Sequence, residues 1–186
     1  MRRLASTRLL ALVCAAVAAA CMLAAPAAQA QQACQSSDVS AADASDRDLA
    51  RATLCLLNQE RGKRGLGSLR LNDRLSHAAD RHAADMVRRE YFSHESLSGS
   101  SFIDRIRRTG YLRSVRAWSV GENLAWGSGD RSSPRSIMRS WMTSPGHRAN
   151  VLDRRYREIG IGIAPGAPQG SWDDAATYAT EFGFRN

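Results

Sequence analysis

The residues of this chain that are best suited to chemistry are two histidines and one glutamate, far apart in the sequence. His94 stands where a helix is expected to end, and His147 stands in the first turn of a short helix that Ser144 and Pro145 would begin. Backbone amides at a helix start disfavour a protonated imidazole, so His147 is expected to be neutral and available as a ligand or base. Glu122 lies in an otherwise apolar, glycine-led segment, where a carboxylate needs a partner.

Each of these residues also has a purely structural interpretation. A histidine such as His94 can interact with the last carbonyl groups of its helix. Of the other two histidines, His82 is expected to be a satisfied, half-buried helix residue, and His77 a surface residue. The sequence contains no His-Glu-x-x-His, no Cys-x-x-Cys, no Gly-x-Ser-x-Gly and no glycine-rich phosphate loop. Spacing alone therefore does not join the candidates into one site.

The first thirty residues are typical of an export signal. Three arginines among the first eight residues precede an uncharged apolar run over 9–25, and Ala28-Gln29-Ala30 is a small-x-small cleavage site. The sequence predicts a cleavable signal peptide over 1–30 and a mature chain that begins at Gln31. Two alternatives are a retained membrane anchor, for which the apolar run is marginal in length, and lipidation at Cys21.

Charge and length point to one exported domain. The 186 residues include 26 basic and 18 acidic side chains, for a formal net charge of +8, and removal of the signal takes away three arginines and no acid. The arginines are interleaved with acidic residues along helical stretches, which is typical of a solvated surface and not of a nucleic-acid-binding stripe. We expect a monomer with no nucleic-acid partner and no stable membrane span after cleavage.

Two of the four cysteines leave with the signal peptide. Cys34 and Cys55 remain, an even number in a chain sent to an oxidising compartment, and the sequence predicts a disulfide between them. The alternative is a buried free Cys55 and a disordered Cys34.

The remaining chain divides into an irregular lead-in over 31–45 and one domain over 46–186. Helices are expected from Ser45 or Asp46 to Gly62, from Asn72 to about residue 91, over 102–109 and from Ser133 onward. Strands are expected near 118–124, over 158–163 and over 175–184. Helices that precede an antiparallel sheet indicate the α+β class.

One predicted strand carries information about packing. Residues 158–163 alternate so that isoleucines occupy one face and glycines most of the other. Glycine on the second face would allow a helix or another backbone to approach closely.

Four motifs in a fixed order carry a resemblance to a known family. They are Tyr-Phe-Ser-His at 91–94, Gly-Glu-Asn-Leu-Ala at 121–125, Trp-Met-x-Ser-Pro-Gly-His-Arg-x-Asn-Val-Leu at 141–152, and Glu-Ile-Gly-Ile-Gly at 158–162. Over residues 48–184 the chain resembles the bacterial branch of the CAP superfamily, which includes cysteine-rich secretory, antigen-five and pathogenesis-related proteins. The resemblance implies a three-layer α-β-α sandwich with a small, mainly antiparallel central sheet and a central cleft.

The same resemblance implies which residues line the cleft. Many family members place two histidines and two glutamates there, and some bind a divalent metal. The matching positions are His94, His147 and Glu122, but Ser144 stands where the second glutamate is expected. Two histidines and a carboxylate would suit Zn or another divalent cation. The set could equally be structural, or could orient a ligand without catalysis.

These observations lead to three hypotheses for the function. The first is a secreted binding module, extracellular or periplasmic and associated with the cell envelope. Its cleft would hold a divalent metal or a small apolar ligand, and its partner would be a lipid, a peptide or an envelope component. The second is a metal-assisted hydrolase of peptide or cell-envelope bonds, with Glu122 as the base. The third is a structural protein of the envelope.

Overall fold

The computed structural model describes residues 34–186, so the predicted signal peptide and its cleavage site lie outside the described residues. Five α-helices and four strands alternate along this part of the chain: α1 (Asp46–Gly62), β1 (Arg70–Leu71), α2 (Asp73–Arg88), α3 (Phe102–Arg108), β2 (Trp118–Ser128), α4 (Pro134–Thr143), α5 (Pro145–Val151), β3 (Glu158–Pro165) and β4 (Ala175–Arg185). Two 3-10 turns, η1 (Ala41–Asp43) and η2 (Gly129–Ser132), complete them. No helix within residues 34–186 is long and apolar enough to span a bilayer.

The helices begin where their capping residues predict. The Ser45 side chain accepts a hydrogen bond from the amide of Asp48, and Asn72 accepts from the amides at the start of α2. Pro134 occupies the first turn of α4, where its missing N–H leaves no bond unmade. The predicted helix bounds therefore agree with the structure to within a few residues.

The four strands form one mixed sheet in the order β1-β3-β4-β2. The β3–β4 and β4–β2 pairs are antiparallel, whereas β1 pairs in parallel with β3. The sequence analysis predicted no strand at β1, because a strand of two residues shows no alternation. The α+β class and the mainly antiparallel sheet are confirmed, and β2 lies at one edge of the sheet.

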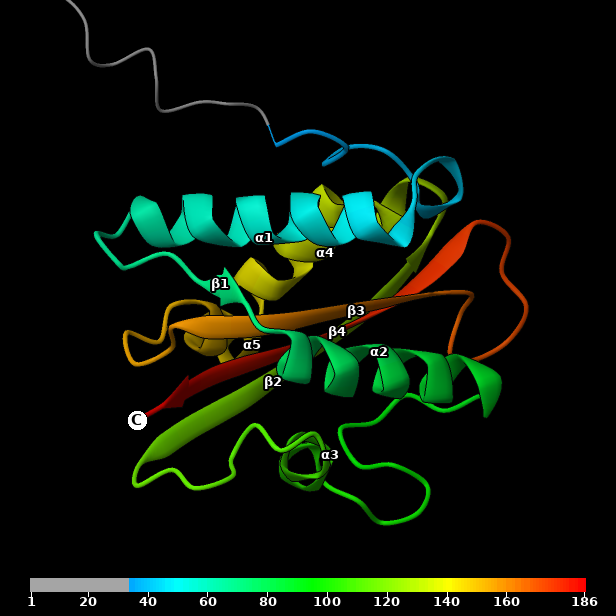
Figure 1. Cartoon of the computed structure of the whole chain (residues 1–186). Coiled ribbons are helices and arrows are strands. Elements are labelled where there is room, and N and C mark those ends of the chain that lie inside the picture. Colours follow the sequence, from blue (N-terminus) through cyan, green and yellow to red (C-terminus); the bar gives the residue numbers. More distant parts are fainter. Residues whose placement is uncertain (1–33) are drawn as a thin grey trace, which may run out of the picture. The chain divides into compact units, whose positions relative to one another are not determined.

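Helices cover both faces of the sheet (Figure 1). α1 and α4 lie on one face, while α2 lies across the other with α3 beside it. The alternating residues of β3 explain this arrangement. A Cβ atom at Gly160 would stand 2.0 Å from the carbonyl carbon of Leu75, and one at Gly162 would stand 2.2 Å from the amide of Asp80. Only glycine lets α2 lie this close to the sheet, as the alternation predicts.

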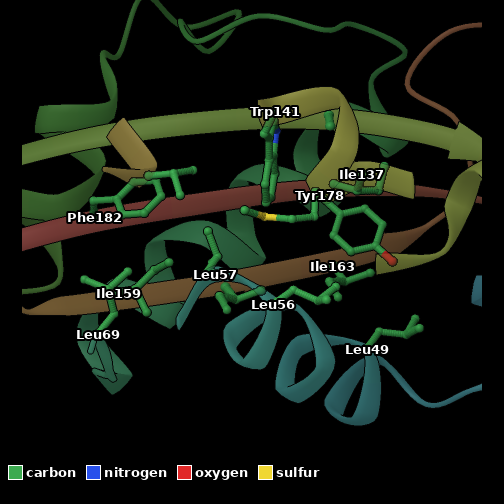
Figure 2. Close-up of a cluster of buried hydrophobic side chains, with 14 of the residues drawn as sticks. Leu49, Leu56, Leu57, Leu69, Ile137, Trp141, Ile159, Ile163, Tyr178 and Phe182 are labelled. Atoms are coloured by element: carbon green, nitrogen blue, oxygen red, sulfur yellow. The ribbon is translucent and has the colours of Figure 1, made fainter. Parts of the chain in front are cut away.

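The main hydrophobic core lies on the other face, under α1 and α4. It contains the β3 isoleucines, the leucines of α1, and Trp141, Tyr178 and Phe182 (Figure 2). The Trp141 indole N–H donates to the carbonyl of Leu124 at 3.1 Å, so the core also anchors α4 to the edge strand β2.

The predicted disulfide is present, and it fixes the lead-in to α1. Cys34 and Cys55 are bonded across 21 residues of sequence. The lead-in also pairs with η2 and α4, because the amide of Ala41 donates to Ser132 Oγ at 2.9 Å and the amide of Arg135 donates to the carbonyl of Ser37 at 2.8 Å.

Candidate functional site

The strongest contact among the predicted site residues joins His94 to Glu122. Glu122 lies on β2 and its side chain is 1 % exposed, whereas the His94 side chain, in the loop between α2 and α3, is 58 % exposed. His94 Nδ1 lies 2.7 Å from Glu122 Oε1. Since a carboxylate only accepts hydrogen bonds, Nδ1 donates, and the neutral ring keeps its lone pair on Nε2. A buried carboxylate thus orients an exposed imidazole.

Arg105, which the sequence analysis did not single out, holds this pair in place. Its Nη2 donates to Glu122 Oε2 at 2.5 Å, and its Nη1 donates to the carbonyl of His94 at 3.0 Å. Two further bonds from Nη1 reach Ser96 Oγ and the carbonyl of Ser100, both at 3.2 Å. One guanidinium from α3 therefore fixes both the carboxylate and the loop that carries His94.

A second glutamate stands beside Glu122, but not where the family resemblance placed it. Glu181 on β4 is the direct cross-strand partner of Glu122, and it is fully buried. Burial, together with the negative charge of Glu122, raises the pKa of Glu181 well above its ordinary value, which favours the protonated carboxyl.

The pKa of Glu122 is shifted in the opposite direction. Burial alone would raise the pKa of Glu122, but the hydrogen bond from His94 and the positive charge of Arg105 outweigh burial and lower it. Glu122 is therefore the ionised member of the carboxyl pair.

His82 completes the buried cluster. It was expected to be half-buried, but the structure leaves it only 1 % exposed. Its Nε2 donates to the carbonyl of Ser93 at 2.9 Å and lies 3.9 Å from Glu122 Oε2. Burial lowers the pKa of His82 despite the charge of Glu122, so the ring is neutral at neutral pH. Its role is to hold the segment that leads to His94.

The backbone of His147 lies on the face of β2 opposite to the Glu122 side chain. Asn123, whose side chain points to the other face of the strand, donates to the carbonyl of His147 at 3.0 Å. Within residues 34–186, no hydrogen bond or ion pair joins the His147 imidazole to Glu122 or His94. Burial and the nearby positive charge of His94 lower the pKa of His147. The sequence predicts a neutral His147 because of the backbone amides at its helix start. In the structure, burial and the charge of His94 are the causes instead.

The short helix that carries His147 is fixed at both ends. As predicted, it begins at Pro145, and Ser144 precedes it as a half-buried residue whose carbonyl accepts from the amide of Arg148. At its other end, the buried Arg61 donates to the carbonyl of Val151 at 2.8 Å. Asn150 donates to the carbonyl of Glu122 at 3.0 Å, which ties α5 to the strand that carries the carboxylate.

The three candidates do not fit a zinc site in which Glu122 is a ligand. Both of its oxygens already accept bonds, from His94 and Arg105, and the buried guanidinium would repel a cation at that point. Within the described part of the chain, no group of three histidine, cysteine, aspartate or glutamate side chains is arranged to hold a metal ion. What remains for a ligand is His94 Nε2 and the ring of His147.

Three residues of the site were not recognised as site residues in the sequence: His82, Arg105 and Glu181. Glu181 gives the same signal as Glu122, a lone acid within an apolar strand, and could have been found by that signal. Nothing in the spacing of Arg105 distinguishes it from the many exposed arginines around it.

Comparisons with known proteins identify the family of this chain. The family model of the cysteine-rich secretory protein family, CAP, matches residues 54–180. Two Bacillus subtilis proteins are similar: the uncharacterized protein YkwD, 35% identical over 107 residues, and the uncharacterized membrane protein YlbC, 34% identical over 110 residues. These matches cover 58% and 59% of this chain, but the chain spans only 39% and 30% of those proteins.

Solved structures show the same fold. An extracellular protein containing an SCP domain from Bacillus anthracis superposes with a TM-score of 0.59 at 24% identity, over 74% of this chain and 40% of that one. An outer surface protein from Borrelia burgdorferi gives a TM-score of 0.63 at 20% identity, over 77% of this chain and 97% of that one.

Proposed function

Because the chain belongs to the cysteine-rich secretory protein family, CAP, we propose that it is an exported binding module whose ligand is held at the edge of β2 by His94 and His147. The observation that carries this proposal is the 2.7 Å contact between His94 Nδ1 and the buried Glu122. It fixes an exposed imidazole so that Nε2 faces outward. The location is supported by structural relatives that are described as extracellular or outer-surface proteins.

The chemistry of the two rings indicates what they recognise. With Nδ1 bonded to Glu122, a neutral His94 offers a lone pair at Nε2, which accepts a hydrogen bond from a hydroxyl or amide group of a ligand. The lowered pKa of His147 favours the neutral form of that ring. In their neutral forms the two imidazoles suit a polar group of a peptide, a lipid or an envelope glycan. They would hold a metal ion only weakly without a third ligand.

The geometry disfavours a hydrolase in which Glu122 is the base. A general base must come within hydrogen-bond reach of a substrate proton, but Glu122 is 1 % exposed and Glu181 is fully buried. Both Glu122 oxygens are occupied, as described above. No serine or cysteine side chain within residues 34–186 is hydrogen-bonded to a histidine ring. Glu122 is therefore a positioning residue.

The proposal is tested with a ligand panel and three single variants. Thermal stability of the purified protein is followed with zinc, short peptides, fatty acids and soluble cell-wall fragments. We expect at least one ligand to raise Tm in the wild type, with a smaller effect in His94→Ala and His147→Ala. His77→Ala is the matched control, because His77 is an exposed histidine of α2 outside the site, and should respond like the wild type. Equal responses in all four proteins would refute the proposal.

A further inference from the structure

A second, separate site is suggested by a groove between α2 and α3. Its volume is about 400 Å³, and none of His94, Glu122 and His147 lines it. Five arginines do, together with a single acidic residue, Asp85; the arginines are Arg81, Arg88, Arg89, Arg105 and Arg108. Such a concentration of one charge sign raises the local concentration of anions.

The positive charge of the groove is only partly compensated. Asp85 bonds to Arg88, lies 3.9 Å from Arg89 Nη1, and also accepts from the Tyr91 hydroxyl at 2.7 Å. Arg108 is bonded only to the uncharged Ser100, and Arg81 makes no hydrogen bond or ion pair within residues 34–186. Arg105 is already paired with the buried Glu122. The charges of the groove that no described carboxylate bonds are therefore those of Arg81 and Arg108.

The floor of the groove contains polar atoms that lack partners. Arg105 and His82 both line the groove and are 8 % and 1 % exposed. Arg105 Nε and His82 Nδ1 are buried and have no hydrogen-bond partner. With Nε2 donating to Ser93, the neutral His82 ring leaves Nδ1 as an acceptor, whereas Arg105 Nε–H is a donor. A buried donor without a partner is uncommon and costly in native proteins. The Arg105 Nε–H is thus a donor that a bound oxyanion would satisfy.

We propose that this groove binds a small, multiply charged oxyanion ligand, one that carries phosphate or carboxylate groups. Guanidinium groups recognise both by paired, charge-assisted hydrogen bonds. The volume exceeds that of a single inorganic ion, which favours a ligand with two or more anionic groups. This inference goes beyond the proposed function: the groove shares Arg105 and His82 with the cluster around Glu122, but neither His94 nor His147 lines it.

The experiment is calorimetric titration of the purified protein with inorganic pyrophosphate and, separately, with citrate. Protein and buffer are freed of divalent metals on a chelating resin beforehand, so that the chelating power of the probes plays no part and no competing polycarboxylate is added. We expect saturable binding of one equivalent of at least one probe, and the two arms distinguish phosphate from carboxylate recognition. Binding of neither probe would overturn the proposal.

Two double variants distinguish specific binding in the groove from nonspecific attraction of anions to a positively charged protein. Arg81→Gln/Arg108→Gln should weaken binding about tenfold or more, because each arginine offers charge-assisted hydrogen bonds. Arg47→Gln/Arg131→Gln removes the same charge from exposed positions outside the groove and should bind as the wild type does. An equal loss in both pairs, or no loss in the groove pair, would overturn the proposal. His94→Ala should leave this binding unchanged, which keeps the test independent of the proposed function.

Discussion

Replacing Glu122 by glutamine tests whether this carboxylate is a structural anchor. The variant keeps the size of the side chain but removes the charge that Arg105 and His94 contact at 2.5 and 2.7 Å. Arg105 is 8 % exposed, so the substitution leaves a nearly buried guanidinium without its closest counter-charge. We expect Glu122→Gln to be well expressed but markedly less stable.

The magnitude follows from the burial of the pair. Breaking a buried ion pair by removing one partner costs about 3–5 kcal/mol. The loss should lie at the lower end, about 3 kcal/mol, because Glu181 Oε1 stands 4.0 Å from Arg105 Nη2 and can ionise once the charge of Glu122 is gone. The hydrogen bond to His94 adds little, since that ring is largely exposed. A loss of this size lowers Tm by roughly 6–12 °C for a domain of this length.

The assay is urea unfolding at pH 7, with and without EDTA. Glu95→Gln is the matched control, because Glu95 is an exposed neighbour of His94 without an ion pair in residues 34–186, and it should change stability by less than about 0.5 kcal/mol. The double variant Glu122→Gln/Glu181→Gln should be less stable than Glu122→Gln, since no carboxylate then remains near Arg105. The reasoning would be refuted if Glu122→Gln lowered the free energy of unfolding by less than about 1 kcal/mol. It would also be refuted if EDTA alone lowered the stability of the wild type by as much as the substitution does.

Three further predictions concern the carboxyl pair, the disulfide and processing. The folded protein keeps Glu181 protonated while the unfolded chain ionises it near 4.5, so stability is lost as pH rises above that value. Glu181→Gln should abolish this loss, which amounts to about 1.4 kcal/mol for each pH unit above 4.5 over which the folded protein keeps the proton. Equal slopes of stability between pH 4 and pH 7 in both proteins would contradict this. Cys34→Ala/Cys55→Ala should lower the free energy of unfolding, measured by thermal unfolding, by roughly 3 kcal/mol or less. Two reactive thiols in the unreduced, unfolded wild type would argue against the disulfide. N-terminal sequencing of the exported protein should begin at Gln31; a lipidated Cys21 at the N-terminus would contradict cleavage after Ala30.

The sequence predicts the elements of this fold well, for local physical reasons. The cap at Asn72 and the proline at the start of α4 determine helix starts within a single turn of chain. The isoleucine and glycine alternation of β3 predicts that one face enters the core and that the other meets a helix backbone, as the position of α2 shows. β1 was not predicted, because its pairing with β3 depends on residues far along the chain.

The site was harder to predict because it depends on strand register and on contacts between segments that are far apart in the sequence. That Glu181 faces Glu122 follows from the pairing of β4 with β2, which no local pattern specifies. Arg105 becomes a buried partner only because α3 packs against the edge of the sheet. The family resemblance drew attention to His94, Glu122 and His147, but it said nothing of the arginine that takes one oxygen of Glu122.

The central claim is that Glu122 holds His94 so that Nε2 is presented to a ligand, and the protonation of that ring tests it most directly. Long-range ¹H–¹⁵N correlation spectra of histidine-labelled protein near pH 8 report which ring nitrogen carries the proton. We predict that neutral His94 carries it on Nδ1 in the wild type, because Nδ1 donates to Glu122, and that Glu122→Gln shifts the proton toward Nε2. A wild-type His94 protonated on Nε2, unchanged in Glu122→Gln, would contradict the claim.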